Sequence, residues 1–452
     1  MNLTDGGMTA KRSAAIKTVG IISLGCAKNL VNSEQMMFLI KSAGFYVTEK
    51  TEDVDAVVVN TCAFIEAAKM EGIETILELG RKKSEGRIGR IIVAGCLAQR
   101  YKEEILKEMP EADAVLGVGS FDDIVKIIEA VGKEEKPAIF GEIDAPVSET
   151  ERIITTSPVW TYIKIAEGCD NRCAYCVIPD IRGRFRSRLP ERIVEEAYGL
   201  TERGVRELII VAQDVTRYGR DIYGESRLVP LLKALCGIEK LKWIRLHYLY
   251  PDEISDELID VIAENDKILK YLDIPIQHIN DGILRKMNRR GSGGDIRALI
   301  IKLRERIPGV VIRTSVITGL PGEGDGEFEE LCEFLRWAKL ERAGIFAYSP
   351  EEGTPAALMD RPDEETAAYR AELLTDIQSQ IMEDFSRSRI GGVSTVLIEG
   401  YGEGRYYGRS FAESPDVDGY IYIEGGGLSP GGFVDVRFTG VENGEPVGEA
   451  LT

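Results

Sequence analysis

Short apolar runs rich in Val and Ile alternate with helix-patterned segments over most of the chain, and this alternation constrains the fold more than any other feature. In the first part of the chain three such runs occur, TVGIISLGC, DAVVVNTC and RIIVAGC, and each ends on a cysteine. Alternating strands and helices are typical of a parallel sheet with helices on its faces. We therefore predict an N-terminal α/β domain over residues 17–132.

Each of the three runs is followed by a segment with apolar residues at helical spacing. After the first run, Asn32 or Ser33 is the expected N-cap and Gly44 the expected stop. Residues 63–80 and 97–109 carry the other two expected helices.

Cys26, Cys62 and Cys96 stand at the carboxyl ends of the three runs. Ligands of open α/β sheets bind beyond the carboxyl ends of the strands. Three cysteines about 35 residues apart in sequence can therefore meet at one edge of the sheet. Simple burial would explain any one of them, but the position shared by all three favours a ligand set.

A second alternation begins after a looser stretch, about 132–157, which we interpret as a linker. Six strand-like runs follow, from VWTYIKIAEG to GIFAYS, and predict an open or partial β/α barrel over 155–386. Its functional face is expected at the carboxyl ends of the strands. After a polar helix near 363–389, short strands separated by Gly, Pro and Asp turns predict a small antiparallel β-barrel over 387–452.

The composition limits the location of the protein and the classes of partner that it can bind. No apolar run approaches the roughly 20 residues of a membrane span, and the first residues lack the apolar core of a secretory signal. We expect a cytoplasmic protein whose thiols are reduced, starting at Met1 or Met8. The net charge of −19 argues against nucleic-acid binding by bulk electrostatics.

A second cysteine set, CDNRCAYC, follows the first strand of the central region and contains Cys169, Cys173 and Cys176. A 4Fe–4S cluster is usually held by four thiolates, so three leave one iron free for a small molecule, as in open catalytic metal sites. Zinc is the alternative. It is disfavoured because neither histidine lies close in sequence and the spacing differs from paired CxxC motifs.

The CxxxCxxC spacing, with Tyr175 before the last cysteine, resembles the signature of the radical S-adenosylmethionine superfamily. The resemblance implies that S-adenosylmethionine chelates the open iron and is cleaved to a 5′-deoxyadenosyl radical. VITGLPGE, with Gly319 and Glu323, resembles the strand end that lines the cofactor pocket, although a tight turn without a ligand would also explain it. Gln213 and Asp214 are further candidates for contact with the polar half of the cofactor.

Other residues are open to two interpretations. The arginines that follow the cluster loop would bind a carboxylate of cofactor or substrate, or form a solvated charged face; they are Arg182, Arg184, Arg186 and Arg188. Cys236 and Cys332 lie among apolar residues at helical spacing, and we expect both in the core. The sequence assigns no catalytic side chain.

A radical S-adenosylmethionine core preceded by a three-cysteine domain and followed by a small barrel resembles the methylthiotransferases. In that family Cys26, Cys62 and Cys96 would hold a second 4Fe–4S cluster, and the C-terminal barrel would be a TRAM domain. The resemblance implies that one S-adenosylmethionine methylates sulfur on the second cluster and that another supplies the radical. An electron donor such as flavodoxin or ferredoxin and a sulfur donor are implied partners.

The family acts on adenosine in transfer RNA or on an aspartate of a ribosomal protein. Residues 388–452 contain four Arg, no Lys and ten Asp or Glu, a net charge of −6, which is unfavourable for a polyanion and suitable for a basic protein. IPDIRGRFRSR, IPIQHIND and YYGRSFAESPDVDGY also resemble the protein-modifying branch. We expect β-methylthiolation of an aspartate in small-subunit ribosomal protein twelve. The alternatives are a transfer RNA enzyme of the family and a non-enzymatic zinc- and RNA-binding module.

Overall fold

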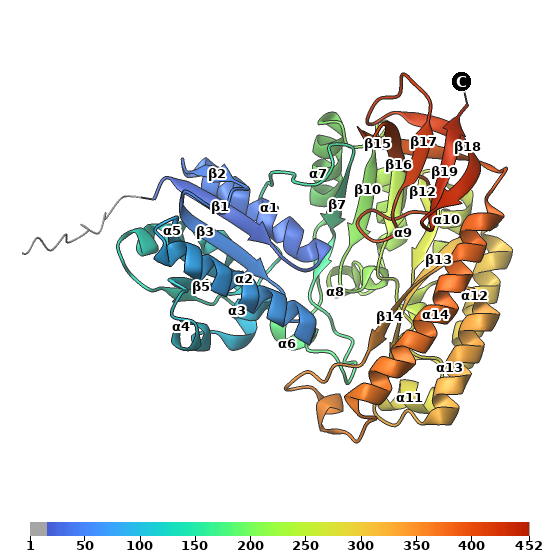
Figure 1. Ribbon diagram of the computed structural model, residues 1–452, viewed down its shortest axis with the longest axis horizontal. Helices are drawn as coiled ribbons and strands as arrows, with labels where there is room; N and C mark the ends of the chain where they lie inside the picture. The colour runs from blue at the N-terminus through green and yellow to red at the C-terminus, as the bar shows by residue number, and fades with distance from the viewer. Residues whose placement is uncertain (1–15, 452) are drawn as a thin grey trace, which may run out of the picture. The chain divides into compact units, whose positions relative to one another are not determined.

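The computed structural model describes residues 16–451, and the chain divides into two compact units, Met1–Ile153 and Ile154–Thr452 (Figure 1). The C-terminal barrel belongs to the same unit as the central sheet. The expected boundaries 17–132, 155–386 and 387–452 therefore stay a prediction. The two candidate start residues, Met1 and Met8, lie outside the described residues.

The first unit is a parallel sheet with the strand order β2-β1-β3-β4-β5-β6. Its strands β3 and β4 are buried almost along their whole length, as expected for a sheet covered on both faces. Helices α1 and α5 contact each other, and α2 packs on β3 and β4. The strands are β1 Thr18–Ser23, β2 Tyr46–Thr48, β3 Val54–Thr61, β4 Ile88–Gly95, β5 Ala114–Leu116 and β6 Ala138–Ile139. The helices are α1 Ala27–Ser42, α2 Glu66–Ser84, α3 Cys96–Tyr101, α4 Glu104–Glu108 and α5 Ile124–Gly132, with a 3₁₀ segment Val118–Asp123.

Three local expectations for this unit were wrong. Helix α1 begins at Ala27, with Cys26 as its N-cap. Asn32 and Ser33 are buried inside the helix, where Asn32 donates to Gln35 and Ser33 accepts from Asn60 of β3. The expected helix 97–109 is broken into α3 and α4 at Lys102, which has φ +48°. Part of the expected linker forms β6, which pairs with β5.

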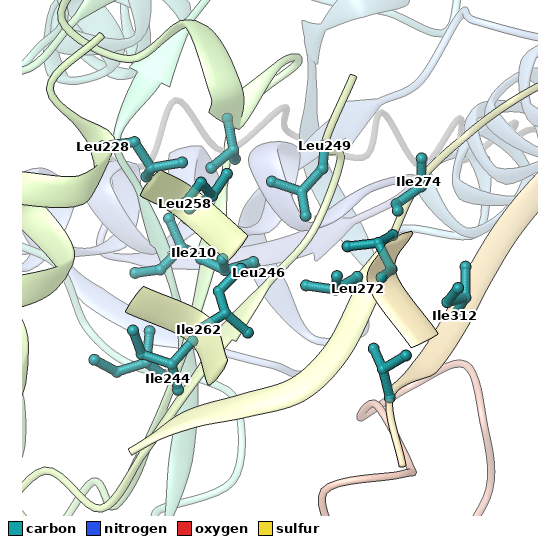
Figure 2. Close-up of a cluster of buried hydrophobic side chains, with 14 of the residues drawn as sticks. Ile210, Leu228, Ile244, Leu246, Leu249, Leu258, Ile262, Leu272, Ile274 and Ile312 are labelled. Carbon is teal, nitrogen blue, oxygen red and sulfur yellow. The ribbon is translucent and has the colours of Figure 1, made fainter. Parts of the chain in front are cut away.

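The second unit contains a six-stranded parallel sheet with the order β14-β13-β12-β11-β10-β7, as the central alternation predicted. Its core lies between the strands and the helices outside them, and includes Ile210, Leu246 and Leu272 (Figure 2). The strands are β7 Trp160–Lys164, β10 Glu207–Val211, β11 Trp243–Leu246, β12 Ile268–Asp273, β13 Val311–Thr318 and β14 Arg342–Ala347. A small antiparallel pair joins β8 Ala166–Glu167 to β9 Arg186–Ser187.

The helices of this unit follow the strands in the order that a β/α barrel requires. They are α6 Ile178–Arg182, α7 Pro190–Glu202, α8 Arg220–Tyr223, α9 Leu228–Cys236, α10 Asp256–Glu264, α11 Asp281–Lys286, α12 Gly293–Arg306, α13 Asp325–Ala338 and α14 Glu364–Ser388. Short 3₁₀ segments occur at Val215–Arg217, Pro251–Glu253 and Pro355–Leu358. Cys332 is buried in the core, as expected, whereas Cys236 is only partly buried and packs against the core. None of the helices in residues 16–451 combines the length and apolarity needed to cross a bilayer.

The C-terminal strands form a closed barrel in the order β15-β16-β17-β19-β18. Within the described part of this region, four pairings are antiparallel and the β17–β19 pairing is parallel. The sequence pattern missed β19 because EPVGEA contains Glu, Pro and Gly and has little apolar alternation. The strands are β15 Val393–Gly402, β16 Arg405–Arg409, β17 Ile421–Glu424, β18 Phe433–Glu442 and β19 Glu445–Ala450.

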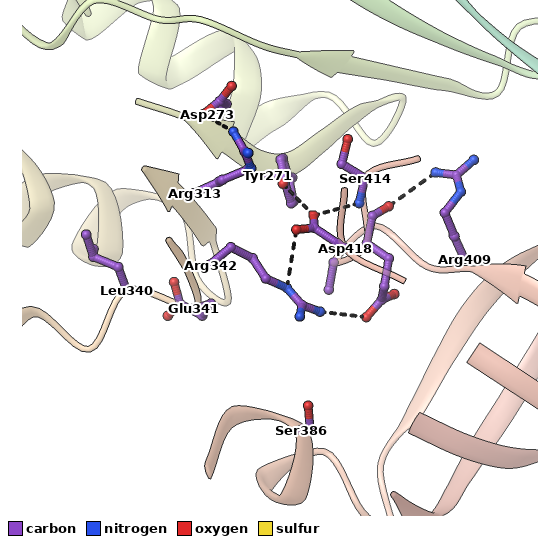
Figure 3. Close-up of polar contacts among 12 residues, drawn as sticks. Tyr271, Asp273, Arg313, Leu340, Glu341, Arg342, Ser386, Arg409, Ser414 and Asp418 are labelled. Atoms are coloured by element: carbon purple, nitrogen blue, oxygen red, sulfur yellow. Dashed lines mark hydrogen bonds and ion pairs between the residues drawn. The ribbon is translucent and has the colours of Figure 1, made fainter. Parts of the chain in front are cut away.

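The loop 410–418 of the small barrel lies against the central sheet, where it contacts β11, β12 and the residue that follows β11 (Figure 3). Tyr271 donates a hydrogen bond to Asp418, and the ring nitrogen of His247 lies 2.8 Å from Ser414 Oγ. Arg342, the first residue of β14, pairs with Glu413 at 3.4 Å. The small barrel also reaches the amino ends of the strands, since Arg409 pairs with Glu207, the first residue of β10, and Glu399 accepts a bond from Trp160, the first residue of β7.

Candidate active site

The three N-terminal cysteines follow three neighbouring strands. Thr61 of β3 is the register partner of Gly95 of β4, so Cys62 and Cys96 come directly after paired positions. Cys26 follows β1, which pairs with β3 on its other side. The topology therefore brings all three to one edge of the sheet, because parallel strands end on the same side.

Asn29 connects the loops that carry these cysteines. Its Nδ2 donates to the carbonyl oxygens of Leu24, at 3.0 Å, and Thr61, at 2.9 Å, and the Cys96 thiol lies 3.8 Å from its Oδ1. Sequence reasoning missed Asn29, because an asparagine inside a helix carries no motif. Gly25, with φ +89°, permits the close approach of the loops, since a Cβ there would lie 2.7 Å from Cys62 Cβ.

The second triad lies in the loop between β8 and α6, at the carboxyl end of the first strand of the central sheet. Cys173 and Tyr175 are buried with Met287, Leu320 and Tyr348. Burial raises the pKa of the Cys169 thiol to about 11, and it raises that of Cys176 still further. Thiols in such surroundings are protonated at neutral pH, so ligation by them releases protons.

Gln213 and Asp214 stand at the carboxyl end of β10. Gln213 donates from Nε2 to Glu167 at 2.9 Å, and its Oε1 is buried without a hydrogen-bond partner. The carboxylate of Asp214 accepts bonds from Thr216 and, at 2.7 Å, from Asn171 of the cysteine loop. Gln213 therefore offers a buried acceptor, whereas Asp214 anchors the loop.

Gly319 and Glu323 lie at the end of β13 and are engaged with the protein. Glu323 accepts bonds from Thr318 Oγ1 at 2.8 Å and from the Gly319 N–H at 2.9 Å, and it pairs with Arg370 at 2.9 Å. A Cβ on Gly319, which has φ +78°, would lie 2.4 Å from Ala367 Cβ of α14. The glycine thus accommodates the helix and the glutamate braces the turn; their direct contact with a cofactor stays a prediction.

The arginine run is divided by burial, and binding of a cofactor or substrate carboxylate by it stays a prediction. Arg182 is buried and pairs with Glu167 at 2.8 Å, and Arg188 is buried and pairs with Glu196 at 2.6 Å. Arg186 donates to the carbonyl oxygens of Arg182 and Arg184. A uniformly solvated face is therefore wrong, because Arg182 and Arg188 are buried against carboxylates, whereas Arg184 is exposed.

Comparison with known proteins identifies the family. Residues 18–117 match the model of "Uncharacterized protein family UPF0004", 163–335 match the "Radical SAM superfamily", and 390–450 match the "TRAM domain". The chain is 46% identical over 447 residues to a ribosomal protein uS12 methylthiotransferase RimO of Acetivibrio thermocellus, and the match covers 96% of this chain and 98% of that protein. The chain belongs to the radical S-adenosylmethionine methylthiotransferases of the RimO type.

A methylthiotransferase of the same name from Caldanaerobacter subterraneus subsp. tengcongensis is 47% identical over 438 residues, which are 96% of this chain and all of that protein. Among solved structures, the radical S-adenosylmethionine methyltransferase TsrM of Kitasatospora setae matches with a TM-score of 0.56 at 14% identity, over 76% of this chain and 77% of that one. At that identity the likeness concerns the fold alone. It agrees with the prediction of a partial β/α barrel.

Membership of the radical S-adenosylmethionine superfamily implies S-adenosylmethionine and a 4Fe–4S cluster for this methylthiotransferase. The residues fit such a group, because three thiols lie in one loop and the buried Gln213 Oε1 is an acceptor at the neighbouring strand end. Within residues 16–451, no three His, Cys, Asp or Glu side chains are grouped so as to hold a single metal ion. A cluster instead distributes its thiolates over separate irons.

Proposed function

We propose that this methylthiotransferase adds a methylthio group to the β-carbon of an aspartate in small-subunit ribosomal protein twelve, with two 4Fe–4S clusters and S-adenosylmethionine. The observation that carries the proposal is the presence of two cysteine triads, each at the carboxyl edge of its own parallel sheet. Relatives at 46–47% identity over 96% of the chain carry the name of a uS12 methylthiotransferase, which supports the protein substrate.

In this proposal Cys169, Cys173 and Cys176 hold the cluster to which S-adenosylmethionine binds. The bound cluster and cofactor supply a carbon radical, which is needed because side-chain bases with pKa values of about 4 to 10 cannot deprotonate an unactivated C–H group. The residues of this chain bind the cluster and the cofactor and orient them toward the substrate. In this proposal Gln213 Oε1, which is buried without a hydrogen-bond partner, accepts a hydrogen bond from the polar half of the cofactor.

Cys26, Cys62 and Cys96 hold the second cluster in this proposal. Support comes from the register of β3 and β4 and from Asn29, which ties together the loops that follow all three strands. Asn29 is thereby a positioning residue for this triad.

Charge supports a protein substrate over transfer RNA. The C-terminal barrel region 388–452 has a net charge of −6, so it would repel phosphates and attract a basic ribosomal protein. A flavodoxin- or ferredoxin-like electron donor and a sulfur donor complete the proposed partners, in the cytoplasm. A transfer RNA enzyme of the family is the second candidate, which methylthiolated adenosine in treated transfer RNA would favour.

The test is anaerobic reconstitution followed by incubation with ribosomal protein twelve, S-adenosylmethionine, sulfide and a reductant. We expect about eight irons per chain, four for each cluster, and one methylthio group on an aspartate, located by tandem mass spectrometry. Cys62→Ala should halve the iron while leaving cofactor cleavage intact. Four irons in the unaltered protein, with methylthiolation unaffected by Cys62→Ala, would contradict the proposal.

A further inference from the structure

The segment that follows α11 holds the second cysteine loop by its backbone. The carbonyl oxygen of Met287 accepts a hydrogen bond from the Ala174 N–H at 2.9 Å. The next residue, Asn288, donates from Nδ2 to the carbonyl oxygen of Arg172 at 2.7 Å. These bonds fix both sides of Cys173 to a segment more than 100 residues further along the chain.

Arg289 continues this segment and directs its side chain to Cys173 itself. Its guanidinium donates from one terminal nitrogen to Cys173 Sγ at 3.8 Å and from the other to the carbonyl oxygen of Pro275. The guanidinium lies 4.2 Å from the ring centroid of Tyr250, whose hydroxyl is 4.0 Å from the same sulfur. The side chain is therefore held in one place by a carbonyl and by an aromatic face.

The buried charge of Arg289 has no carboxylate partner among the described residues. Arg289 is 9% exposed. Its neighbour Arg290 also approaches the Tyr250 ring, but it pairs with Asp252 at 3.1 Å and with Glu253 at 2.9 Å. Burying an unpaired cation is costly, so a negative group is expected beside Arg289. Thiolate ligands of an iron–sulfur cluster would supply that charge.

We propose that Arg289 positions Cys173 and raises the reduction potential of the cluster bound by its loop. The inference rests on the proposed ligation by Cys173. Reduction adds one electron, and with it one negative charge, to the cluster. A fixed cation close to a ligand sulfur stabilises the reduced form, and hydrogen bonds to the sulfurs and net charge are the means by which proteins set such potentials.

The experiment is a potentiometric titration of the reconstituted full chain, with dithionite as reductant and electron paramagnetic resonance as readout. To isolate one signal, every protein also carries Cys62→Ala. Arg289→Gln should move the midpoint to a more negative potential while iron content is kept, and Arg289→Lys, which keeps the charge, should restore part of the shift. Arg290→Gln is the matched control and should leave the midpoint unchanged.

An unchanged midpoint in Arg289→Gln with iron retained would overturn the inference and leave the proposed function intact. If Arg289→Gln does not fold, Arg289→Lys is the deciding variant. An altered spectrum or an altered midpoint potential in Arg289→Lys supports the positioning role. If neither changes, the positioning role is contradicted. Absence of iron in the parent protein, with the same result after Cys173→Ala, would instead contradict the proposed function.

Discussion

The two ends of the central barrel are built differently. At the amino ends of the strands the small barrel reaches the sheet, and charged side chains meet opposite charges. At the carboxyl ends lies the cysteine loop, where thiols sit in apolar surroundings and the Gln213 Oε1 lacks a partner. The first end resembles a protein interior and the second a site prepared for a ligand.

The amino end is held by a buried ionic network. Glu207, the first residue of β10, accepts bonds from Arg245 at 2.8 Å and from Arg409 of the small barrel at 2.8 Å. Arg409 also pairs with Glu399, which accepts a bond from Trp160 at 2.8 Å. Since each of these charges has its partner, the network fixes the small barrel in place.

The difference indicates that the amino end of the barrel contributes to stability and that the carboxyl end carries the chemistry. Removing a partner at the amino end leaves a buried charge alone and should destabilise the fold, whereas removing a thiol at the carboxyl end should abolish function and leave the fold intact. The four predictions below test this separation, from the largest expected effect to the smallest.

Cys173→Ala should abolish reductive cleavage of S-adenosylmethionine, because one of the three proposed thiolate ligands is lost. Cleavage is measured as 5′-deoxyadenosine by liquid chromatography, and thermal unfolding of the iron-free protein should change little. Cys332→Ala is the matched control, since it removes a buried thiol from the core of the same unit at a cost of about 1 kcal/mol or more. Retained cleavage in Cys173→Ala would contradict the assignment of the chemistry to the carboxyl ends of the strands.

Arg409→Met should lower the free energy of unfolding by about 3–5 kcal/mol, because the buried carboxylates of Glu207 and Glu399 lose a partner. Urea denaturation of the iron-free protein measures this. Arg405 lies on the same strand as Arg409 and forms an exposed pair with Glu442 of β18. Arg405→Met should leave the urea midpoint of unfolding nearly unchanged. Equal effects of the two variants would show that the network does not stabilise the amino end.

Gln213→Leu should raise the KM for S-adenosylmethionine about tenfold, the value of roughly one hydrogen bond of 1.4 kcal/mol. Gln378→Leu is a close control, because Gln378 Oε1 is also buried without a partner but lies on α14, where its Nε2 donates to the Leu340 carbonyl oxygen. That variant should alter stability and leave KM unchanged. A rise in KM shared by both variants would assign the effect to the fold.

Glu413→Gln should remove part of the acid sensitivity of the amino end. Burial opposes ionisation of Glu413, but Arg389 and Arg342 outweigh it, and they lower its pKa from 4.5 to about 2. A lowered folded-state pKa gives stability that is fully present above about pH 4.5 and is lost as the pH falls toward 2. The destabilisation caused by the variant should therefore be larger at pH 6 than at pH 3 in urea denaturation.

Glu424→Gln, which changes an exposed carboxylate of the same barrel, is the control for this pH dependence. It should show the same small effect at both values of pH. A destabilisation by Glu413→Gln that does not vary between pH 6 and pH 3 would contradict the charged network.

Local pattern predicted the strands well, but it failed at several junctions. Val- and Ile-rich runs marked the strands that carry cysteines, and all six strands of the central sheet. It missed β2, β5 and β6, which have only two or three residues each, and β19, whose sequence EPVGEA has little apolar alternation. It also placed the start of α1 too late, since Asn32 and Ser33 have cap chemistry but bond instead to Gln35 within the helix and to Asn60 of β3.

The sequence by itself determined the order of the elements and the positions of the six cysteines, because a strand period and a ligand spacing are local properties. Only the tertiary structure decided which polar groups lie beside the cysteines and the strand ends. Arg289 approaches Cys173 across 116 residues of sequence, and Arg409 pairs with Glu207 across 202. A buried charge is set by what the folded chain brings beside it. No local pattern contains that information.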